Sequence, residues 1–468
     1  MTTKLRTLLL VFIIWLLQSA SHVISAQADP ILKILYSFNA NSGYQPHASV
    51  LQARDGNFYG TTFAGGAYGR GTVYKITPNG TLTVLHNFSG GQDGAFPNAG
   101  LIQGKEGYLY GTEEGGGDFG YGSVFQISTN GKTFNTLCHF DNAANGAMPL
   151  GGVIQATDGM LYGVTSVAGQ FNRGTIYRVK ISRSSSKPSQ LTTLYSFGAA
   201  SPEDGSEPFA SLIQADDGAL YGTTYQGGPN GYGTVFRISL TGDYATLYLF
   251  TAGNDGANPR ASLIQAADGN LYSTTEYGGM YGSGIVFRIT TAGALTTLYS
   301  FTGGADGGYP YGNVIQANDT NFYGTTYAGS GSVFQLNPLG VLTTLYAFNG
   351  FDGSGPYAGM IQGSDGNFYG TTLQGGLNDS GTVFEIIVTP VVTTFRPVKG
   401  PVGTKVTLTG ANFTGVTSVR IGTIAAAFSI NSDASLTLTV PTGALSGKII
   451  VTNNYGQGMS STKFTVTP

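Results

Sequence analysis

Leu212-Ile-Gln-Ala-Asp-Asp-Gly-Ala-Leu-Tyr-Gly-Thr-Thr-Tyr-Gln-Gly-Gly228, followed by Gly233-Thr-Val-Phe236, is one copy of a pattern that fills most of this sequence. Its Tyr-Gly-Thr-Thr centre recurs, with variants, at seven tyrosines spaced by 51, 52, 59, 51, 51 and 46 residues. These are Tyr59, Tyr110, Tyr162, Tyr221, Tyr272, Tyr323 and Tyr369. A fixed period of about 50 residues indicates a repeat architecture.

Each repeat holds four short runs rich in β-forming residues, separated by glycine-containing turns. In the copy at 261–301 the runs are residues 261–266, 270–275, 284–289 and 295–301, which we name strands a, b, c and d. Such runs, joined by Asp-Gly and Gly-Gly signals, are typical of antiparallel hairpins. Four antiparallel strands in about 50 residues match one blade of a β-propeller.

The order of the strands predicts how the ring closes. The first d run, residues 34–38, precedes the first a run, and no d run follows the last c run at 381–386. We therefore expect 34–38 to pair with 381–386 and complete the seventh blade, which removes a free sheet edge. A linear β-solenoid would not need this offset, so the sequence favours an all-β, seven-bladed β-propeller.

The first thirty residues resemble a secretory signal. Lys4 and Arg6 precede an apolar run at 8–17, and Ile24-Ser-Ala26 offers a small-residue cleavage site, so we expect a signal peptide over 1–26. The apolar run is shorter than the ~20 residues of a membrane span, and we expect no span after cleavage. Cys138, the single cysteine, is expected to be a buried structural thiol.

Beyond the repeats, the C-terminal part has a different pattern. We expect the propeller to occupy 31–388 and a second domain to occupy 389–468, where short alternating strands predict a β-sandwich. The motif Gly-x-x-Val-x-Leu-x-Gly-x-Asn-Phe at 403–413 resembles the IPT/TIG immunoglobulin-like family. In exported proteins that resemblance implies a spacer or contact module.

The repeat itself resembles the Gloeo-Verruco tandem repeat of exported bacterial proteins, in register over about 31–388. This resemblance implies a secreted or cell-surface protein and brings no established catalytic residues. A looser likeness to the sensor propellers of two-component regulators, which share the Asp-Gly-Asn-aromatic turn, implies the same fold.

Composition and turn chemistry exclude several classes of function. Lys and Arg number 22 against 25 Asp and Glu, so no basic surplus is present to neutralise nucleic-acid phosphates. The Asp-Gly turns carry one carboxylate each, where calcium needs several oxygen ligands, and Asp-Gly also suits a type I′ turn. We therefore expect no metal and no cofactor. The glutamine of each strand a is interpreted as a hydrogen-bond partner of the backbone.

Function is expected where the blades differ. The residue after each d–a loop proline is large and variable, and propeller geometry places it at the axial mouth: His47, Asn98, Leu150, Phe209, Arg260, Tyr311 and Tyr357. The b–c loops add aromatic residues to the same face: Tyr68, Phe119, Tyr121, Phe171, Tyr232 and Tyr281. Exposed aromatics of this kind stack on sugars or anchor proteins. The alternative is that they pack between neighbouring blades.

Three functions remain open from the sequence. The first is an exported, non-enzymatic binding or adhesion protein that holds a glycan or a surface protein at this mouth. The second is a glycan hydrolase or lyase that uses Arg260, His47 and Glu207, and the third is a structural surface spacer. The sequence leaves the ligand, the mode of cell attachment and the oligomeric state open.

Overall fold

The computed structural model describes residues 31–182, 188–201, 204–453 and 456–468. The expected signal peptide, residues 1–26, lies outside the described residues. The described chain divides into two compact units, with the boundary between Val388 and Thr389. None of the described residues belongs to a helix long and apolar enough to cross a membrane.

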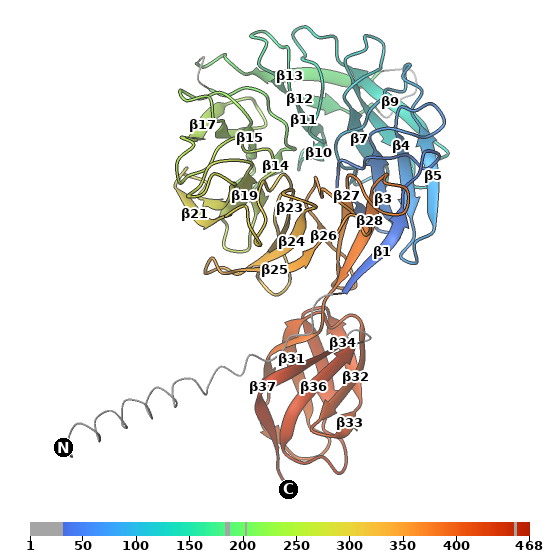
Figure 1. Ribbon diagram of the computed structural model, residues 1–468, viewed down its shortest axis with the longest axis vertical. Helices are drawn as coiled ribbons and strands as arrows, with labels where there is room; N and C mark the ends of the chain where they lie inside the picture. The colour runs from blue at the N-terminus through green and yellow to red at the C-terminus, as the bar shows by residue number, and fades with distance from the viewer. Residues whose placement is uncertain (1–30, 183–187, 202–203, 454–455) are drawn as a thin grey trace, which may run out of the picture. The chain divides into compact units, whose positions relative to one another are not determined.

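Within the described residues, the first unit consists of seven four-stranded antiparallel sheets, the blades of a β-propeller (Figure 1). Blades 1 to 3 are β2 (Leu51–Gln52), β3 (Phe58–Thr62), β4 (Thr72–Ile76) and β5 (Leu82–Asn87); β6 (Ile102–Gln103), β7 (Leu109–Glu113), β8 (Ser123–Ile127) and β9 (Phe134–His139); β10 (Ile154–Gln155), β11 (Leu161–Thr165), β12 (Thr175–Lys180) and β13 (Gln190–Ser196). Blades 4 to 6 are β14 (Ile213–Gln214), β15 (Leu220–Thr224), β16 (Thr234–Ile238) and β17 (Tyr244–Leu249); β18 (Ile264–Gln265), β19 (Leu271–Thr275), β20 (Ile285–Ile289) and β21 (Leu295–Ser300); β22 (Ile315–Gln316), β23 (Phe322–Thr326), β24 (Ser332–Leu336) and β25 (Leu342–Ala347). Blade 7 is β26 (Ile361–Gln362), β27 (Phe368–Thr372), β28 (Thr382–Ile387) and β1 (Ile31–Ser37).

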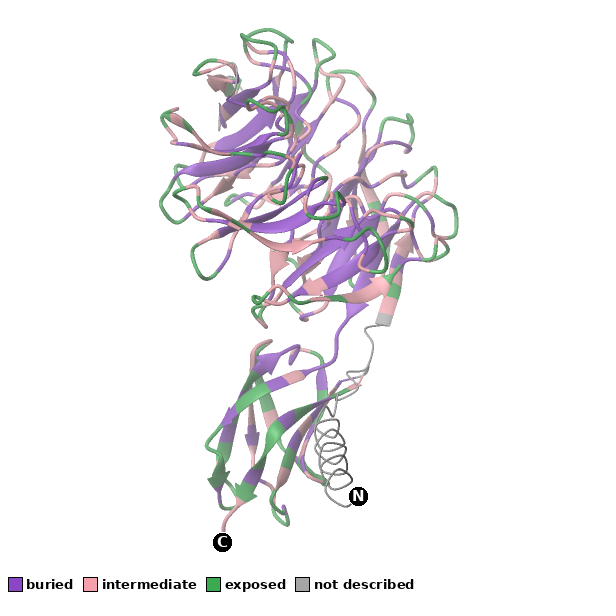
Figure 2. Cartoon of the chain, turned by 60° about the vertical axis from the view of Figure 1, so that its left-hand side comes forward, coloured by how far each residue is buried: buried purple, intermediate pink, exposed green. Residues whose placement is uncertain are grey.

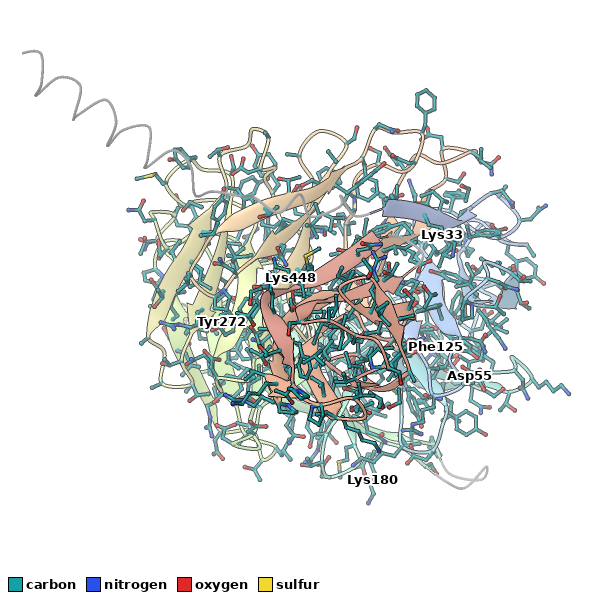
Figure 3. All side chains as sticks on the ribbon, turned by 90° about the horizontal axis from the view of Figure 1, so that it is seen from below. Lys33, Asp55, Phe125, Lys180, Tyr272 and Lys448 are labelled. Atoms are coloured by element: carbon teal, nitrogen blue, oxygen red, sulfur yellow. The ribbon has the colours of Figure 1, made fainter. Side chains whose placement is uncertain are left out.

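The predicted closure of the ring is confirmed. Strand β1 pairs antiparallel with β28, from Leu32 opposite Ile386 to Ser37 opposite Thr382. Lys33 lies opposite Glu385, and its Nζ donates to Glu385 Oε2 at 2.9 Å (Lys33 is labelled in Figure 3). The blade therefore combines the two ends of the repeat region, 352 residues apart.

Successive blades pack through the same apolar surfaces. Every b strand is buried along its length, and in Figure 2 the buried residues of the propeller lie mainly on its strands while the exposed ones lie mainly in its loops. Between blades 1 and 2, Tyr59 and Phe88 pack with Leu109 and Phe125. The cluster that joins blade 7 to blade 1 is of the same kind, so the closing interface is an ordinary blade interface. Cys138 is buried in β9, as expected.

The repeated glutamines connect each blade to the next, which confirms their interpretation as backbone partners. Each side-chain oxygen accepts a hydrogen bond from an amide in the a–b turn of the preceding blade, at 2.8 to 3.1 Å. The acceptors are Gln103, Gln155, Gln214, Gln265, Gln316, Gln362 and Gln52, and the donors are Arg54, Lys105, Thr157, Asp216, Ala267, Asn318 and Ser364. The last bond, from Ser364 to Gln52, returns the series to its start.

The inner strands are shorter than the sequence predicts. Only two residues of each a run pair with strand b, for example Leu51 and Gln52 in blade 1. The preceding residues bond to side chains instead: Thr61 Oγ1 donates to the Ala99 carbonyl at 3.1 Å, and Thr371 Oγ1 to the Ala48 carbonyl at 2.9 Å. Side-chain donors of this kind replace the backbone ladder near the axis.

The type I′ expectation for the Asp-Gly turns is wrong. In blade 1 the Gly56 amide donates to the Ala53 carbonyl at 2.9 Å, and within this turn only Gly56 has a positive φ, +79°. This is a type I turn followed by a glycine bulge, since type I′ needs positive φ at both central residues. Two hydrogen bonds stabilise this type I turn: Asp55 accepts one from the Asn57 amide at 3.1 Å and one from the Tyr59 hydroxyl at 2.7 Å.

The second unit is an immunoglobulin-like sandwich of two sheets. One sheet contains β29 (Val391–Arg396), β31 (Lys405–Ala411), β35 (Ser435–Thr439) and β34 (Phe428–Ser432). The other contains β30 (Lys399–Gly400), β37 (Gly456–Val466), β36 (Gly447–Asn453), β32 (Val416–Ile421) and β33 (Ile424–Ala426). Alternating residues of both sheets, with Val406, Leu436 and Ile449 fully buried, form a single core.

The Lys33–Glu385 pair offers a test of the closure. Glu385 is buried, and its partners are Lys33, Asn367 and Tyr369. Lys33→Glu removes the only cation among them and adds a second carboxylate, so it should lower the free energy of unfolding by about 1 kcal/mol or more. Adding Glu385→Lys should restore it, because other blades place Lys75 or Arg237 here, opposite Thr83 or Ala245. Urea denaturation of both variants measures the effect. Equal stability of the single and the reversed double variant would contradict the pairing.

Candidate functional site

The seven inner segments meet around a cavity of about 230 Å³ on the propeller axis. Each segment contributes three consecutive residues to its lining. The first of the three is the residue that follows the loop proline: His47, Asn98, Leu150, Phe209, Arg260, Tyr311 and Tyr357. The repeat pattern predicts these seven positions as an axial set, and the structure brings all of them to one cavity.

The backbone conformation of the residue before each proline directs the following side chain to the mouth. All seven of these residues have a positive φ between 52° and 61°: Gln45, Phe96, Met148, Glu207, Asn258, Tyr309 and Gly355. Each is bonded on both sides. The Asn258 amide donates to the Tyr232 carbonyl of the preceding blade at 2.8 Å, and its carbonyl accepts from the Glu276 amide at 3.2 Å. A conformation that non-glycine residues rarely adopt is thus held in place by the d–a and b–c loops together.

Arg260 is the centre of a cluster of side chains at the mouth. Its guanidinium carbon lies 4.9 Å from the ring centroid of Tyr357, 5.3 Å from that of Phe209 and 5.4 Å from that of Tyr311. The guanidinium donates to the Tyr357 hydroxyl, and its Nη1 lies 3.9 Å from Glu276 Oε2. Cation–π contacts and an ion pair therefore fix the arginine between three rings.

His47 forms a second cluster beside the first. Its Nδ1 lies 2.5 Å from Asn98 Oδ1, and its ring stacks on Phe63 with centroids 4.4 Å apart. Burial lowers the pKa of His47; the Asn98 hydrogen bond opposes this shift, and the charge of Arg260 adds to it. The imidazole is therefore neutral at pH 7.

A second variable ring, which the sequence analysis missed, supports the first. It consists of the residue after each b strand: Phe63, Glu114, Ser166, Tyr225, Glu276, Tyr327 and Leu373. In four blades this residue contacts the mouth residue of its own blade: Phe63 stacks on His47, Tyr225 packs on Phe209, Glu276 pairs with Arg260, and Tyr327 stacks on Tyr311. In the aligned repeats, the residue after each b strand differs between blades as much as the residue after each proline does. This variability is the sequence signal that points to the second ring.

The b–c loop aromatics lie outside the cavity and face solvent. Tyr68 is 63% exposed, Phe119 59%, Tyr281 57%, Phe171 42%, and Tyr121 and Tyr232 40% each. The alternative that they pack between blades is therefore wrong for these six, and they remain available to a large ligand.

Neither Glu207 nor the turn aspartates line the cavity. Glu207 does not line the cavity, whereas His47 and Arg260 do, so the trio of the hydrolase hypothesis is not brought together there. The turn aspartates accept hydrogen bonds from the Tyr-Gly-Thr-Thr tyrosines, at 2.5 to 2.8 Å, in six blades: Asp55, Asp158, Asp217, Asp268, Asp319 and Asp365. Across the described ranges, no three His, Cys, Asp or Glu residues are grouped as metal ligands would be.

Comparison with known proteins bears on family and fold. Residues 23–216 and 208–426 match the Gloeobacter/Verrucomicrobia repeat, and 390–467 match the IPT/TIG domain. No curated protein matches the sequence. The extracellular domain of a putative hybrid two-component system from B. thetaiotaomicron is similar in structure, with 11% identity, a TM-score of 0.50, and coverage of 93% of this chain and 57% of that one. A gluconolactonase from Xanthomonas campestris aligns with 13% identity, a TM-score of 0.42, and coverage of 78% and 92%.

The environment of His47 predicts its titration. Its imidazole should titrate below pH 6.5, because burial opposes the charged form. Arg260→Gln should raise the midpoint, since a positive charge is removed, while Asn98→Ala should lower it further. Proton NMR of the imidazole signals, with His47→Gln to assign the resonance, measures these shifts. A midpoint above 6.5, or one unaffected by Arg260→Gln, would contradict this electrostatic description.

Proposed function

We propose that this chain, which belongs to the Gloeobacter/Verrucomicrobia repeat family and carries a C-terminal IPT/TIG domain, is an exported binding protein that holds a glycan at the axial mouth of its propeller. Export is part of the proposal and rests on the signal sequence expected over 1–26. A surface protein is the alternative ligand, and it would use the exposed b–c loop aromatics as well as the mouth.

The observation that carries the proposal is the group of rings around Arg260. Tyr311, Tyr357 and Phe209 present flat apolar faces, and Arg260 supplies hydrogen-bond donors among them. Sugar rings have apolar faces and a rim of hydroxyl groups, so this combination suits them. The mouth is also preformed, because each of these side chains is already in contact with another.

The bonding of the polar groups supports binding over catalysis. His47 is paired with Asn98, and Arg260 is held by Tyr357 and Glu276. Groups fixed in this way lose little freedom when a ligand arrives, which favours affinity. A hydrolase would need two carboxyl groups at one site. Glu207, the acid of that hypothesis, is not among the residues that line the mouth.

A glycan array with the mature protein tests the proposal. We expect binding to at least one glycan class, and Tyr311→Ala or Tyr357→Ala should weaken it by about tenfold or more, equivalent to ~1.4 kcal/mol. The matched control is Leu339→Ala, a residue that is 89% exposed in a c–d turn and should leave binding unchanged.

The other hypotheses give different results in the same assay. Turnover of a bound glycan would replace the proposal with an enzymatic function. A chain that binds neither glycans nor surface proteins would be a structural spacer. Binding that survives both tyrosine substitutions would place the ligand elsewhere than the mouth.

A further inference from the structure

A second cavity, of about 350 Å³, lies beside the mouth and is walled by tyrosines. Its lining consists of Tyr277, Tyr309, Tyr311, Tyr327, Ala328 and Gly329. Tyr311 belongs to both cavities, so the two sites adjoin. Neither a lysine nor an arginine is among the lining residues.

This cavity exists because one loop is short. In blade 6 the b–c loop comprises residues 327–331, four fewer than the 276–284 loop of blade 5. The other blades match blade 5: residues 63–71, 114–122, 166–174, 225–233 and 373–381. Beside the short loop Tyr309 and Tyr327 are half-buried, and the exposed fraction of Tyr277 on the neighbouring blade is 41%. The gap thus occurs where four tyrosines meet.

The four rings form two pairs. Tyr311 and Tyr327 stack with centroids 4.7 Å apart, and Tyr277 meets Tyr309 edge to face at 5.7 Å. The second pair joins blade 5 to blade 6. Rings at these angles to one another present several π-surfaces to one volume, as in an aromatic cage.

A buried carboxylate stands behind this wall. Glu276 is 3% exposed, and its Oε2 has no hydrogen-bond partner among the described residues. The nearest cation, Arg260, lies 3.9 Å from that oxygen. The carboxylate of Glu276, together with burial, raises the pKa of Tyr277 to about 12; burial raises the pKa of Tyr311, and the charge of Glu276 adds to that shift. The negative charge therefore acts on two of the four rings.

We propose that this tyrosine cage, formed by Tyr277, Tyr309, Tyr311 and Tyr327, binds a quaternary or methylated ammonium group. Such a cation is attracted by the faces of electron-rich rings and needs no hydrogen-bond acceptor, which matches a wall of rings. Glu276 and Arg260 form an ion pair beside the cage, so their charges largely offset each other and the attraction for the cation comes from the ring faces.

Calorimetric titration with choline and with its neutral isostere 3,3-dimethyl-1-butanol tests the proposal. Choline should bind about tenfold more tightly than the isostere, because only choline gains the cation–π attraction. Equal binding of the two would show a merely apolar pocket and overturn the proposal, as would the absence of choline binding at millimolar concentration. Phosphocholine, glycine betaine and a trimethyllysine peptide, titrated in parallel, distinguish a lipid head group, a free solute and a modified protein as sources.

Three variants locate the binding. Tyr327→Ala and Tyr309→Asn should abolish choline binding; Asn is chosen because it tolerates the positive φ of position 309. Replacing residues 327–331 by the 276–284 loop should also abolish it by filling the gap. Tyr281→Ala, an exposed tyrosine of the neighbouring loop, is the matched control and should bind normally. Thermal melts check that each variant is folded, and choline binding that persists in the folded cage variants would overturn the proposal.

The test separates this site from the mouth. Phe209 lines the mouth but not the cage, so Phe209→Ala should impair glycan binding and leave choline binding intact. Loss of both ligands in Phe209→Ala would contradict a distinct cage. Failure of the glycan proposal alone would leave the choline result unchanged.

Discussion

The pairing of β1 with β28 is the constraint on which the rest of the structure depends. Without it, β28 would expose an unpaired edge at one end of a row of blades, and sheet edges of this kind promote association. The pair is also chemically distinct. Glu385 meets Lys33, whereas the equivalent residues of the other blades are cationic or amide side chains: Lys75, Gln126, Arg178, Arg237, Arg288 and Gln335. The positive charge of Lys33 on β1 and the negative charge of Glu385 on β28 therefore favour the pairing of these two strands.

Closure turns each column of the repeat into a ring of side chains around one axis. Columns that hold the blades together are nearly uniform, such as the glutamines and the Tyr–Asp pairs of the turns. Two columns are free to vary: the residue after each loop proline and the residue after each b strand. Together they form the mouth, where Arg260 and His47 are held among aromatic rings. The short loop of blade 6 adds a local asymmetry, and the tyrosine cage is its consequence.

The sequence predicts the blade number, the offset of the first strand and the first mouth ring, because each follows from counting repeats and aligning prolines. It does not predict the length of the inner strands. The threonine equivalent to Thr61 recurs in six repeats, but the repeat pattern does not show that its hydroxyl donates to the inner segment of the next blade. The ion pair of Lys33 and Glu385 depends on a register between segments 352 residues apart. The role of Glu276 is not predicted either, since its burial and its pairing with Arg260 depend on the three-dimensional arrangement.

Hydrogen exchange of the β1 amides tests the closed ring most directly. If β1 is an integral strand of blade 7, its bonded amides between residues 32 and 37 should be protected as strongly as those of β13, β17 or β21, the outer strands of other blades, and should open together with β28. Rapid exchange of β1 while the outer strands of blades 3 to 5 remain protected would contradict the closure, and with it the account of the mouth.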